Sequence, residues 1–406
     1  MEIPVFCIFI FVYAGMILGG IPGLVLDRTG IALIGAIAVI LTGAASPIEA
    51  WNAVDVSTIA LLFGLMVVSS QFRLGGFYVA VTRALAASPY SPERILLLLV
   101  YISGLLSALL ANDIVCLAMA PILIEGCAKK KLNPVPFLIA LACASNIGSA
   151  ATLIGNPQNM LIGQGLKLSF RGYLLDGAIP AALGLFGAWG IICWNYRGRW
   201  RCEFRLPEVV APVFNLWQSG KGLVILALLL AVFLFTPWPR EAAALAAAGI
   251  LLTSRKMESR NMLGLVDWHV LVLFIGLFVV NHALNATGLA AAGILRLANS
   301  GADLHHPAWL FGATVVLSNL VSNVPAVMLL MPAATHPLAG PVLALSSTLA
   351  GNLIIVGSIA NIIVVDKAAQ CGIRIGWKEH ARAGIPITIL TLAIAAVWLG
   401  MRAVMH

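Results

Sequence analysis

Apolar runs of about 20 residues, the length that a helix needs to cross a bilayer, recur along nearly the whole chain. No stretch shows the short alternating pattern of a transmembrane barrel. The pattern predicts an all-α polytopic membrane protein with about ten transmembrane helices. We expect them near residues 4–22, 29–45, 56–72, 135–165, 173–195, 221–237, 241–254, 268–284, 340–366 and 385–404.

Two longer apolar segments are interrupted near their centres by polar residues. Residues 93–128 contain the pair Asn112-Asp113, and residues 306–337 contain Ser322-Asn323. Non-helical backbone at membrane depth is tolerated only where it is buried in protein or lines a cavity, so both segments are expected to be re-entrant hairpins. A short amphipathic piece precedes each hairpin, at 75–88 and 288–299. These pieces are expected to lie in the membrane interface.

The two halves of the chain carry matching charged residues and matching breaks of the apolar runs in the same order. Asp55 matches Asp267 and Arg28 matches Arg240, each pair 212 residues apart (267 minus 55). Each half holds five expected spans, an odd number, so the second half should run inverted through the membrane. Interrupted helices at matching places in inverted halves indicate a transporter's binding site. The organisation predicted is a first repeat at 1–196, a linker at 197–220 and a second repeat at 221–406.

Composition and charge agree with this interpretation. The chain is 61% hydrophobic and only 10% charged, which excludes a soluble domain. Its net charge of +8 fits basic cytoplasmic loops, because lysine and arginine concentrate on that side, and it does not call for nucleic acid as a partner. The N-terminus is predicted to lie outside, because this orientation places 19 of the 24 lysines and arginines, those of the linker and Arg28 included, in the cytoplasm. Of the 24 lysines and arginines, the only ones outside are then Lys167, Arg171, Arg240, Arg296 and Arg402. The expected location is the inner (plasma) membrane, with the lipid bilayer as a partner.

Four polar breaks supply the candidate chemistry: the two hairpin tips and the segments 146–159 and 348–361. Amide, hydroxyl and free carbonyl oxygens suit a hard cation such as Na⁺, whereas helix N-termini favour anions. Asp113 lies far from both expected membrane surfaces, where a carboxylate costs roughly 2.5–3.5 kcal/mol. It could bind a cation, carry a coupling proton, or be a buried structural acid.

The candidate substrate- or ion-binding residues are therefore Asn112, Asp113, Ser145, Asn146, Gly148, Thr152, Gly155, Asn156, Asn159, Ser322, Asn323, Gly357, Ser358 and Asn361. A sodium site could use Asn112, Asp113, Gly148 and Asn323. No other cofactor is expected.

The same segments carry a resemblance to a known family. Ala111-Asn112-Asp113 with Pro121, the run NIGSAATLIGNPQN at 146–159, Ser322-Asn323-Val324-Pro325, and Gly351-Asn352 through Asn361 resemble the ion-transporter superfamily. That superfamily includes divalent-anion/sodium symporters, citrate carriers, arsenite permeases and NhaD-type sodium/proton antiporters. The resemblance implies an inverted-repeat fold with two hairpins, a homodimer formed by a scaffold subdomain, and elevator-like movement of a transport subdomain.

The hairpin tips differ from those of the symporter branch, which carries Ser-Asn-Thr at both. Here they read Ala-Asn-Asp and Ser-Asn-Val. The acidic residue at the first tip is more similar to the arsenite-permease and antiporter branches, and the missing threonines put dicarboxylate recognition of the symporter type in doubt. By resemblance, one half-site would comprise Asn112, Asp113, Gly148, Thr152 and Asn156, and the other Ser322, Asn323, Gly357 and Asn361.

The sequence thus predicts a secondary active transporter of a small anion or oxyanion, of the arsenite or organic- or inorganic-anion type, coupled to H⁺ or Na⁺ through Asp113. The alternative is a Na⁺/H⁺ antiporter of the NhaD type. The chain has no GxxxxGK[ST] motif for ATP, although a separate partner ATPase could drive it. An intramembrane enzyme would need a HExxH helix or a His paired with an acid at bilayer depth. Neither occurs in the sequence, so no enzyme is expected. A channel would need a charge ring or a carbonyl filter, which is not evident.

Overall fold

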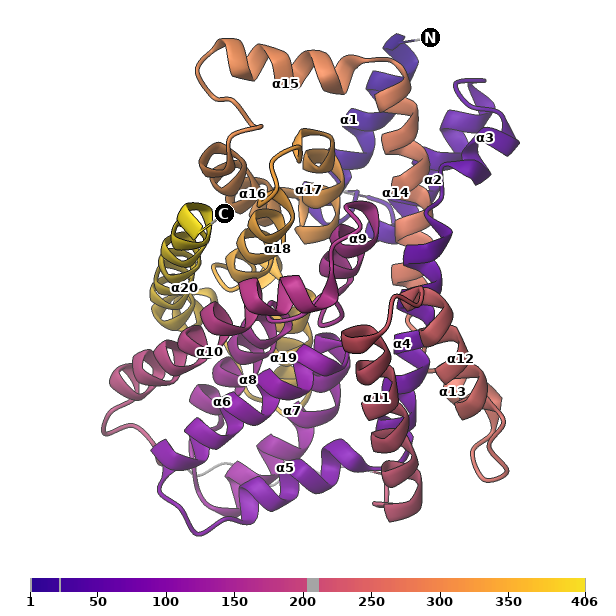
Figure 1. Ribbon diagram of the computed structural model, residues 1–406. Helices are drawn as coiled ribbons and strands as arrows, with labels where there is room; N and C mark the ends of the chain where they lie inside the picture. Colours follow the sequence, from indigo (N-terminus) through magenta and orange to yellow (C-terminus); the bar gives the residue numbers. More distant parts are fainter. Residues whose placement is uncertain (1, 22, 203–211, 406) are drawn as a thin grey trace.

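The computed structural model describes residues 2–21, 23–202 and 212–405, and these residues form helices without any β-strand (Figure 1). In the first half the helices are α1 (Glu2–Leu18), α2 (Arg28–Leu41), α3 (Pro47–Asn52), α4 (Val56–Leu74), α5 (Phe77–Ala87), α6 (Pro92–Leu109), α7 (Asn112–Lys129), α8 (Pro134–Ser149), α9 (Pro157–Gly165) and α10 (Phe170–Asn195).

The second half repeats this order of long, short and broken elements. Its helices are α11 (Leu216–Phe235), α12 (Arg240–Leu252), α13 (Ser259–Leu263), α14 (Trp268–Ala286), α15 (Leu289–Asn299), α16 (Pro307–Val321), α17 (Asn323–Leu330) with the 3₁₀ turn η1 (Met331–Ala333), α18 (Ala339–Ala350), the turn η2 (Ile355–Gly357), α19 (Ile359–Gln370) and α20 (Trp377–Met405). The matching order supports the repeat hypothesis; the inverted relation of the halves stays a prediction.

Six helices of the described chain are long and apolar enough to cross a membrane: α4, α6, α10, α11, α14 and α20. The remaining expected spans are shorter helices, α1, α2 and α12, or the pairs α8–α9 and α18–α19 that are broken in the middle. The breaks fall where the sequence analysis expects unwound centres. The total of ten spans remains a prediction, because length and composition alone single out six helices, one of them the first arm of a hairpin.

Two helices begin earlier than the apolar pattern suggests. Helix α11 starts at Leu216, inside the segment expected to be the linker, because the Asn215 side chain caps it by accepting from the Gln218 amide. Helix α20 starts at Trp377, with two polar turns before its apolar part. Residues 203–211 of the predicted linker lie outside the described residues.

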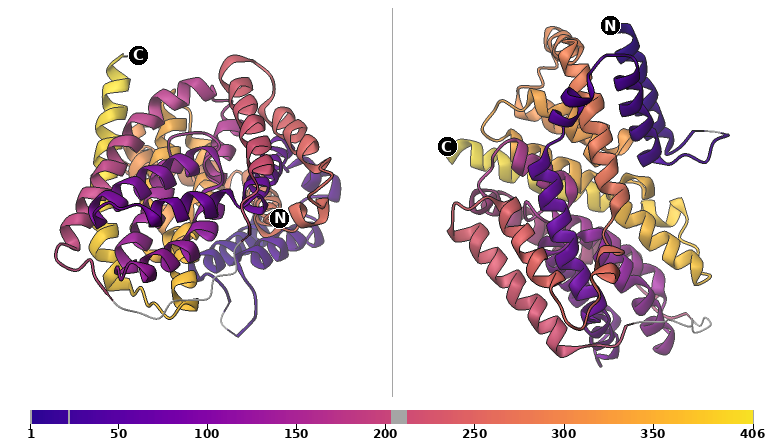
Figure 2. Two further views of the ribbon diagram at one scale, coloured as in Figure 1. Left: turned by 90° about the horizontal axis from the view of Figure 1, so that it is seen from below. Right: turned by 90° about the vertical axis from the view of Figure 1, so that its right-hand side faces the viewer.

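One part of the molecule is a bundle in which the two halves interlock. Helix α4 packs on α12, and α14 packs on α2. A Cβ placed on Gly64 would lie 2.7 Å from the carbonyl carbon of Ala244, and one placed on Gly276 would lie 2.7 Å from that of Ala32. The two contacts are reciprocal, as in a two-fold interface. Helices α1 and α11 complete the bundle, α1 against α2 and α14, α11 against α4 and α12. Figure 2 shows α4, α11 and α12 along one side.

The second part holds the hairpins and the broken helices. Helices α6 and α8 pack together, as do α16 and α18, and α10 lies along α20. Asp176 of α10 accepts from Arg402 of α20 at 2.8 Å, and both side chains are largely buried. Removing one partner of a buried pair leaves an uncompensated charge, so this contact ties the last helices of the two halves together.

Helices α5 and α15, the two pieces that were expected to lie in the membrane interface, lie at opposite ends of the molecule (Figure 1). Helix α5 packs against α6 and α7, and it buries Tyr78, Val79, Thr82 and Leu85. Helix α15 packs against α14, and none of its residues is buried. The two short amphipathic pieces are thus helices as expected, but they are packed differently.

Candidate functional site

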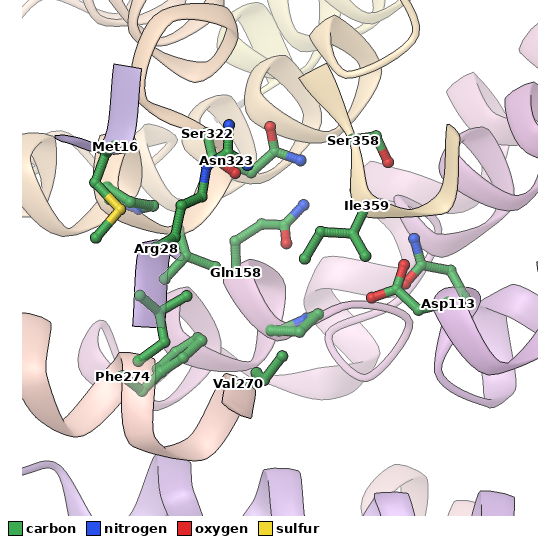
Figure 3. Close-up of a pocket in the computed structure, with 15 residues that line it drawn as sticks. Met16, Arg28, Asp113, Gln158, Val270, Phe274, Ser322, Asn323, Ser358 and Ile359 are labelled. Carbon is green, nitrogen blue, oxygen red and sulfur yellow. The ribbon is translucent and has the colours of Figure 1, made fainter. Parts of the chain in front are cut away.

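All four polar breaks meet at one cavity of about 60 Å³, enough for a few water molecules. The breaks and the bundle form opposite walls. From the breaks come Asn112, Asp113, Pro157, Gln158, Ser322, Asn323, Val324, Pro325, Ser358 and Ile359, and from the bundle come Met16, Arg28, Val270, Leu273 and Phe274 (Figure 3).

Several helices begin at this cavity, which gives it an electrostatic character. The first residues of α2, α7, α17 and α19 line it, as do the first two of α9. Helix α9 is capped by Asn156, but α7, α17 and α19 have no side-chain cap. The first amides of a helix lack intrahelical partners and carry a partial positive charge. Uncapped N-termini that face one cavity are suited to an anion.

Asp113 is the only acidic residue among those that line the cavity. Its side chain is partly exposed, and no hydrogen bond or ion pair of its carboxylate occurs within the described residues. The neighbouring Asn112 is buried and donates to Asn146 at 3.4 Å, while its own Oδ1 has no partner. The first hairpin tip therefore presents two unpaired acceptor groups.

Asn146 sits at the centre of a buried network that joins three of the breaks. Its Nδ2 donates to Oδ1 of Asn352 at 2.8 Å and to Oδ1 of Asn361 at 3.2 Å. Its Oδ1 accepts from Ser358 at 2.8 Å and from Asn112 at 3.4 Å. A buried amide with this many partners fixes the breaks relative to one another.

A second network lies beside the first. The Thr348 hydroxyl accepts from Asn156 and from Gln158, each at 3.2 Å, and is 3.3 Å from Oδ1 of Asn159. The Asn159 amide donates to the Thr152 carbonyl at 2.9 Å. These bonds hold the α8–α9 break against helix α18 of the other half.

The second hairpin tip is strained and touches the bundle. Ser322 has φ 77° and ψ 161°, a region that is otherwise nearly restricted to glycine. Asn323 accepts from the Ser318 hydroxyl. The Tyr13 hydroxyl of α1 contacts the carbonyl of Pro325 at 3.2 Å and Oδ1 of Asn281 in α14 at 2.9 Å. Strain of this kind costs about 1–3 kcal/mol and is typical of functional tips.

The predicted site residues divide into three groups. Those that line the cavity are Asn112, Asp113, Ser322, Asn323 and Ser358. Those in the adjoining networks are Asn146, Thr152, Asn156, Asn159 and Asn361. The remaining four neither line the cavity nor take part in these side-chain networks: Ser145, Gly148, Gly155 and Gly357.

The glycines serve close packing in this structure. A Cβ on Gly148 would lie 2.1 Å from the Gly104 carbonyl oxygen, and one on Gly155 would lie 2.4 Å from that of Ser149. A Cβ on Gly357 would lie 3.0 Å from Oδ1 of Asn319. Of the four residues suggested for sodium, Asn112, Asp113 and Asn323 line the cavity, with Asp113 and Asn323 on opposite sides of it (Figure 3), and Gly148 does not line it.

Sequence reasoning missed Arg28, Gln158, Thr348 and Asn352. It counted Arg28 among the cytoplasmic charges and did not consider it for the site, but the side chain lines the cavity. Gln158 lies inside the third break, and Thr348 and Asn352 lie inside the fourth, so the repeat itself could have revealed them. For Arg28 the only signal is its match to Arg240.

Comparison with known proteins agrees with this architecture. The family model described as Citrate transporter (CitMHS) matches residues 11–342. The chain belongs to the CitMHS family. An uncharacterised transporter of Mycobacterium tuberculosis is 32% identical to it, over 86% of this chain and 87% of that protein. The silicon efflux transporter LSI3 of rice is 28% identical, over 94% of each.

A solved structure shows the same fold. The YdaH transporter of Alcanivorax borkumensis superimposes with a TM-score of 0.59, covering 98% of this chain and 97% of that one, at 13% identity. This protein of the CitMHS family is accordingly a multi-pass membrane protein and a secondary transporter.

Proposed function

We propose that this CitMHS-family protein moves a small anion or oxyanion through the cavity at the four breaks. The observation that carries the proposal is the set of three uncapped helix N-termini, α7, α17 and α19, that face the same enclosed space. At α7 the Asn112 amide donates to the Gly155 carbonyl and the Ile114 amide donates to the Ala111 carbonyl. The first amides of α17 and α19 have no side-chain cap, and an anion would satisfy their hydrogen bonds and partial charges. The citrate of the family description is compatible with an anionic substrate, whereas the silicon in the name of the rice relative is compatible with an oxyacid that is neutral at neutral pH.

Coupling to H⁺ or Na⁺ is assigned to Asp113. An unpaired carboxylate in a membrane protein's interior is costly and is a functional site by default. It stands at the tip of α7 beside the unpaired Oδ1 of Asn112. A proton or a sodium ion bound there would balance part of the charge of the anion, so that the two move together.

Alternating access follows from the division of the cavity walls. One wall belongs to the interlocked bundle, and the other belongs to the hairpins and broken helices. An elevator-like displacement of the second wall along the first would carry the site across the membrane. If the linker is cytoplasmic, α5 would be the cytoplasmic interfacial helix, and its packing on the first hairpin would correspond to a state in which the moving unit lies toward the cytoplasm. We further propose that the bundle forms the contact of a homodimer in the plasma membrane.

A Na⁺/H⁺ antiporter is the second candidate. The observation in its favour is that the unpaired side-chain groups of the first tip, the Asp113 carboxylate and the Asn112 Oδ1, are both acceptors, which suit a cation. In that case the two cations would exchange at Asp113 and no anion would cross.

Counterflow distinguishes the two functions. Purified protein is reconstituted into liposomes that are preloaded with an unlabelled anion, and uptake of the same labelled anion is followed without any ion gradient. Citrate, phosphate, arsenite and germanic acid, a stand-in for silicic acid, would be tried in turn. We expect exchange of citrate or phosphate, the two probes that are charged at neutral pH. Exchange of none, together with proton movement driven by Na⁺ alone, would establish the antiporter.

A further inference from the structure

We propose that Arg28 binds the negative charge of the substrate, so that the site selects species that are anionic when bound over neutral hydroxides of similar size. This inference rests on the proposed function. Arg28 is the first residue of α2, and it lines the cavity from the bundle side. In Figure 3 its side chain points toward Ser322 and Asn323, while Asp113 lies across the cavity beyond Gln158 and Ile359.

The guanidinium of Arg28 is not used by the protein itself. Across residues 2–21, 23–202 and 212–405, it makes no ion pair or hydrogen bond, and its buried Nε has no partner. The adjacent Asp27 is exposed, and its carboxylate accepts from the Gly30 amide to cap α2. The only acid of the cavity, Asp113, is not within ion-pairing distance of Arg28.

The matching arginine of the second half shows what a structural role looks like. Arg240 donates from Nη2 to the Gly163 carbonyl at 2.7 Å, at the C-terminal end of α9. A cation at a helix C-terminus complements the helix dipole. Arg28 lies instead at the N-terminus of its own helix and near the N-terminus of α17, where a cation is unfavourable.

An anion in the cavity resolves this conflict. It would lie between the guanidinium and the uncapped amides of α17. Both of these protein groups carry positive charge, so the anion would be attracted to each of them. Guanidinium presents a planar fork of donors that matches a carboxylate or an oxyanion. The volume of about 60 Å³ limits the part of the substrate enclosed in this state to a small group such as one carboxylate or one tetrahedral oxyanion.

The positive charge of Arg28 belongs to the bundle and not to the breaks. Arg28 belongs to α2, which packs on α14 in the bundle, whereas the other polar groups of the cavity belong to the breaks. The substrate would thus be held by the bundle through Arg28 in this state, and it would leave Arg28 when the breaks move. Arg28 is for this reason a specificity-determining residue.

The test is counterflow in proteoliposomes with labelled citrate and labelled phosphate, which are charged at neutral pH, and with germanic acid, which is neutral. Arg28→Gln should raise the half-saturating concentration of the charged probe that the wild type exchanges by about 10- to 100-fold, since a hydrogen bond to a charged group contributes that much. Arg28→Lys should recover part of the loss. Exchange of germanic acid, where it occurs, should be unchanged.

Arg296→Gln on the exposed helix α15 removes the same charge and should leave half-saturation within about twofold. Monodisperse elution of each purified variant shows that it is folded, and a purely structural effect would lower the maximal rate and not the affinity. Wild-type exchange of an anion with an unchanged Arg28→Gln half-saturation overturns the inference and leaves the proposed function intact. Wild-type exchange of the neutral probe alone also overturns it. Exchange of no probe by the wild type overturns both.

Discussion

The bundle contacts and the interfacial helices differ in how closely the two halves match. In the bundle, Gly64 lies against Ala244 and Gly276 lies against Ala32. In both cases a Cβ added to the glycine would lie 2.7 Å from the carbonyl carbon of the facing alanine. Of the two short amphipathic helices, α5 packs on α4 and on the first hairpin and buries four side chains, and α15 buries none. A Cβ on Gly126 of α7 would lie 2.4 Å from the Cβ of Ala86 in α5, but one on Gly293 of α15 would meet nothing within 4 Å.

Under the proposed elevator-like movement, this difference would distinguish the fixed part from the moving part. Two equivalent halves make the same contact at every equivalent place only if no part has moved relative to the rest. The bundle, whose contacts match, would be the fixed part, and the unit that carries the hairpins would be displaced toward α5. The unpacked face of α15 is then the place where the same unit would lie in the opposite state.

The largest expected effect concerns the reciprocal glycines. Gly64→Ala and Gly276→Ala should each be destabilised by about 1–3 kcal/mol relative to Gly249→Ala, because the new methyl group meets backbone atoms of the facing helix. Gly249 in α12 has nothing within 4 Å, so its variant gains only helix propensity. Equilibrium unfolding in mixed micelles measures the differences. A loss of stability in only one of the two variants would show that the contacts are not equivalent.

A smaller effect is expected in hydrogen exchange of the interfacial helices. Amides of α15 should exchange about tenfold faster than those of α5, since local opening of a helix without buried side chains costs less. Mass spectrometry of peptides from the two helices in the same sample measures the ratio.

Gly126→Leu provides the matched perturbation. Its side chain should displace α7 from α5, so exchange in α5 should rise, and exchange in α15 should fall as the moving unit approaches it. Gly293→Leu, which faces open space, should change neither. Faster exchange in α5 with no protection of α15 would mean that the variant only loosens the packing and that α15 is not the second docking position.

The sequence predicted much of the fold because the membrane imposes a strict apolar pattern. The hairpins expected at 93–128 and 306–337 correspond to α6–α7 and to α16 through η1, and the unwound centres lie between α8 and α9 and between α18 and α19. The start of α11 at Leu216 was missed, because it depends on a local cap by Asn215 and not on apolar residues. The number of spans could not be settled by pattern, since short and broken helices fall below a full bilayer length.

Five of the residues that were selected because they interrupt apolar runs line the cavity: Asn112, Asp113, Ser322, Asn323 and Ser358. Their role in binding stays a prediction. Arg28 could not be found in this way, because it lies at the end of a run, where a charge looks like a surface residue. What brings it to the cavity is the packing of α2 on α14, a tertiary contact that no local pattern contains.

The central claim is that Asp113 couples a cation to the movement of an anion, and proteoliposomes test it most directly. The liposomes carry a pH-sensitive dye inside, labelled sodium reports Na⁺, and gradients of Na⁺ and of the exchanged anion are imposed separately on wild type and Asp113→Asn. The account predicts that protons or sodium move with the anion only when the anion is present, and that Asp113→Asn stops this coupled movement. Proton movement driven by a Na⁺ gradient without any anion, or a variant that behaves as wild type, would contradict it.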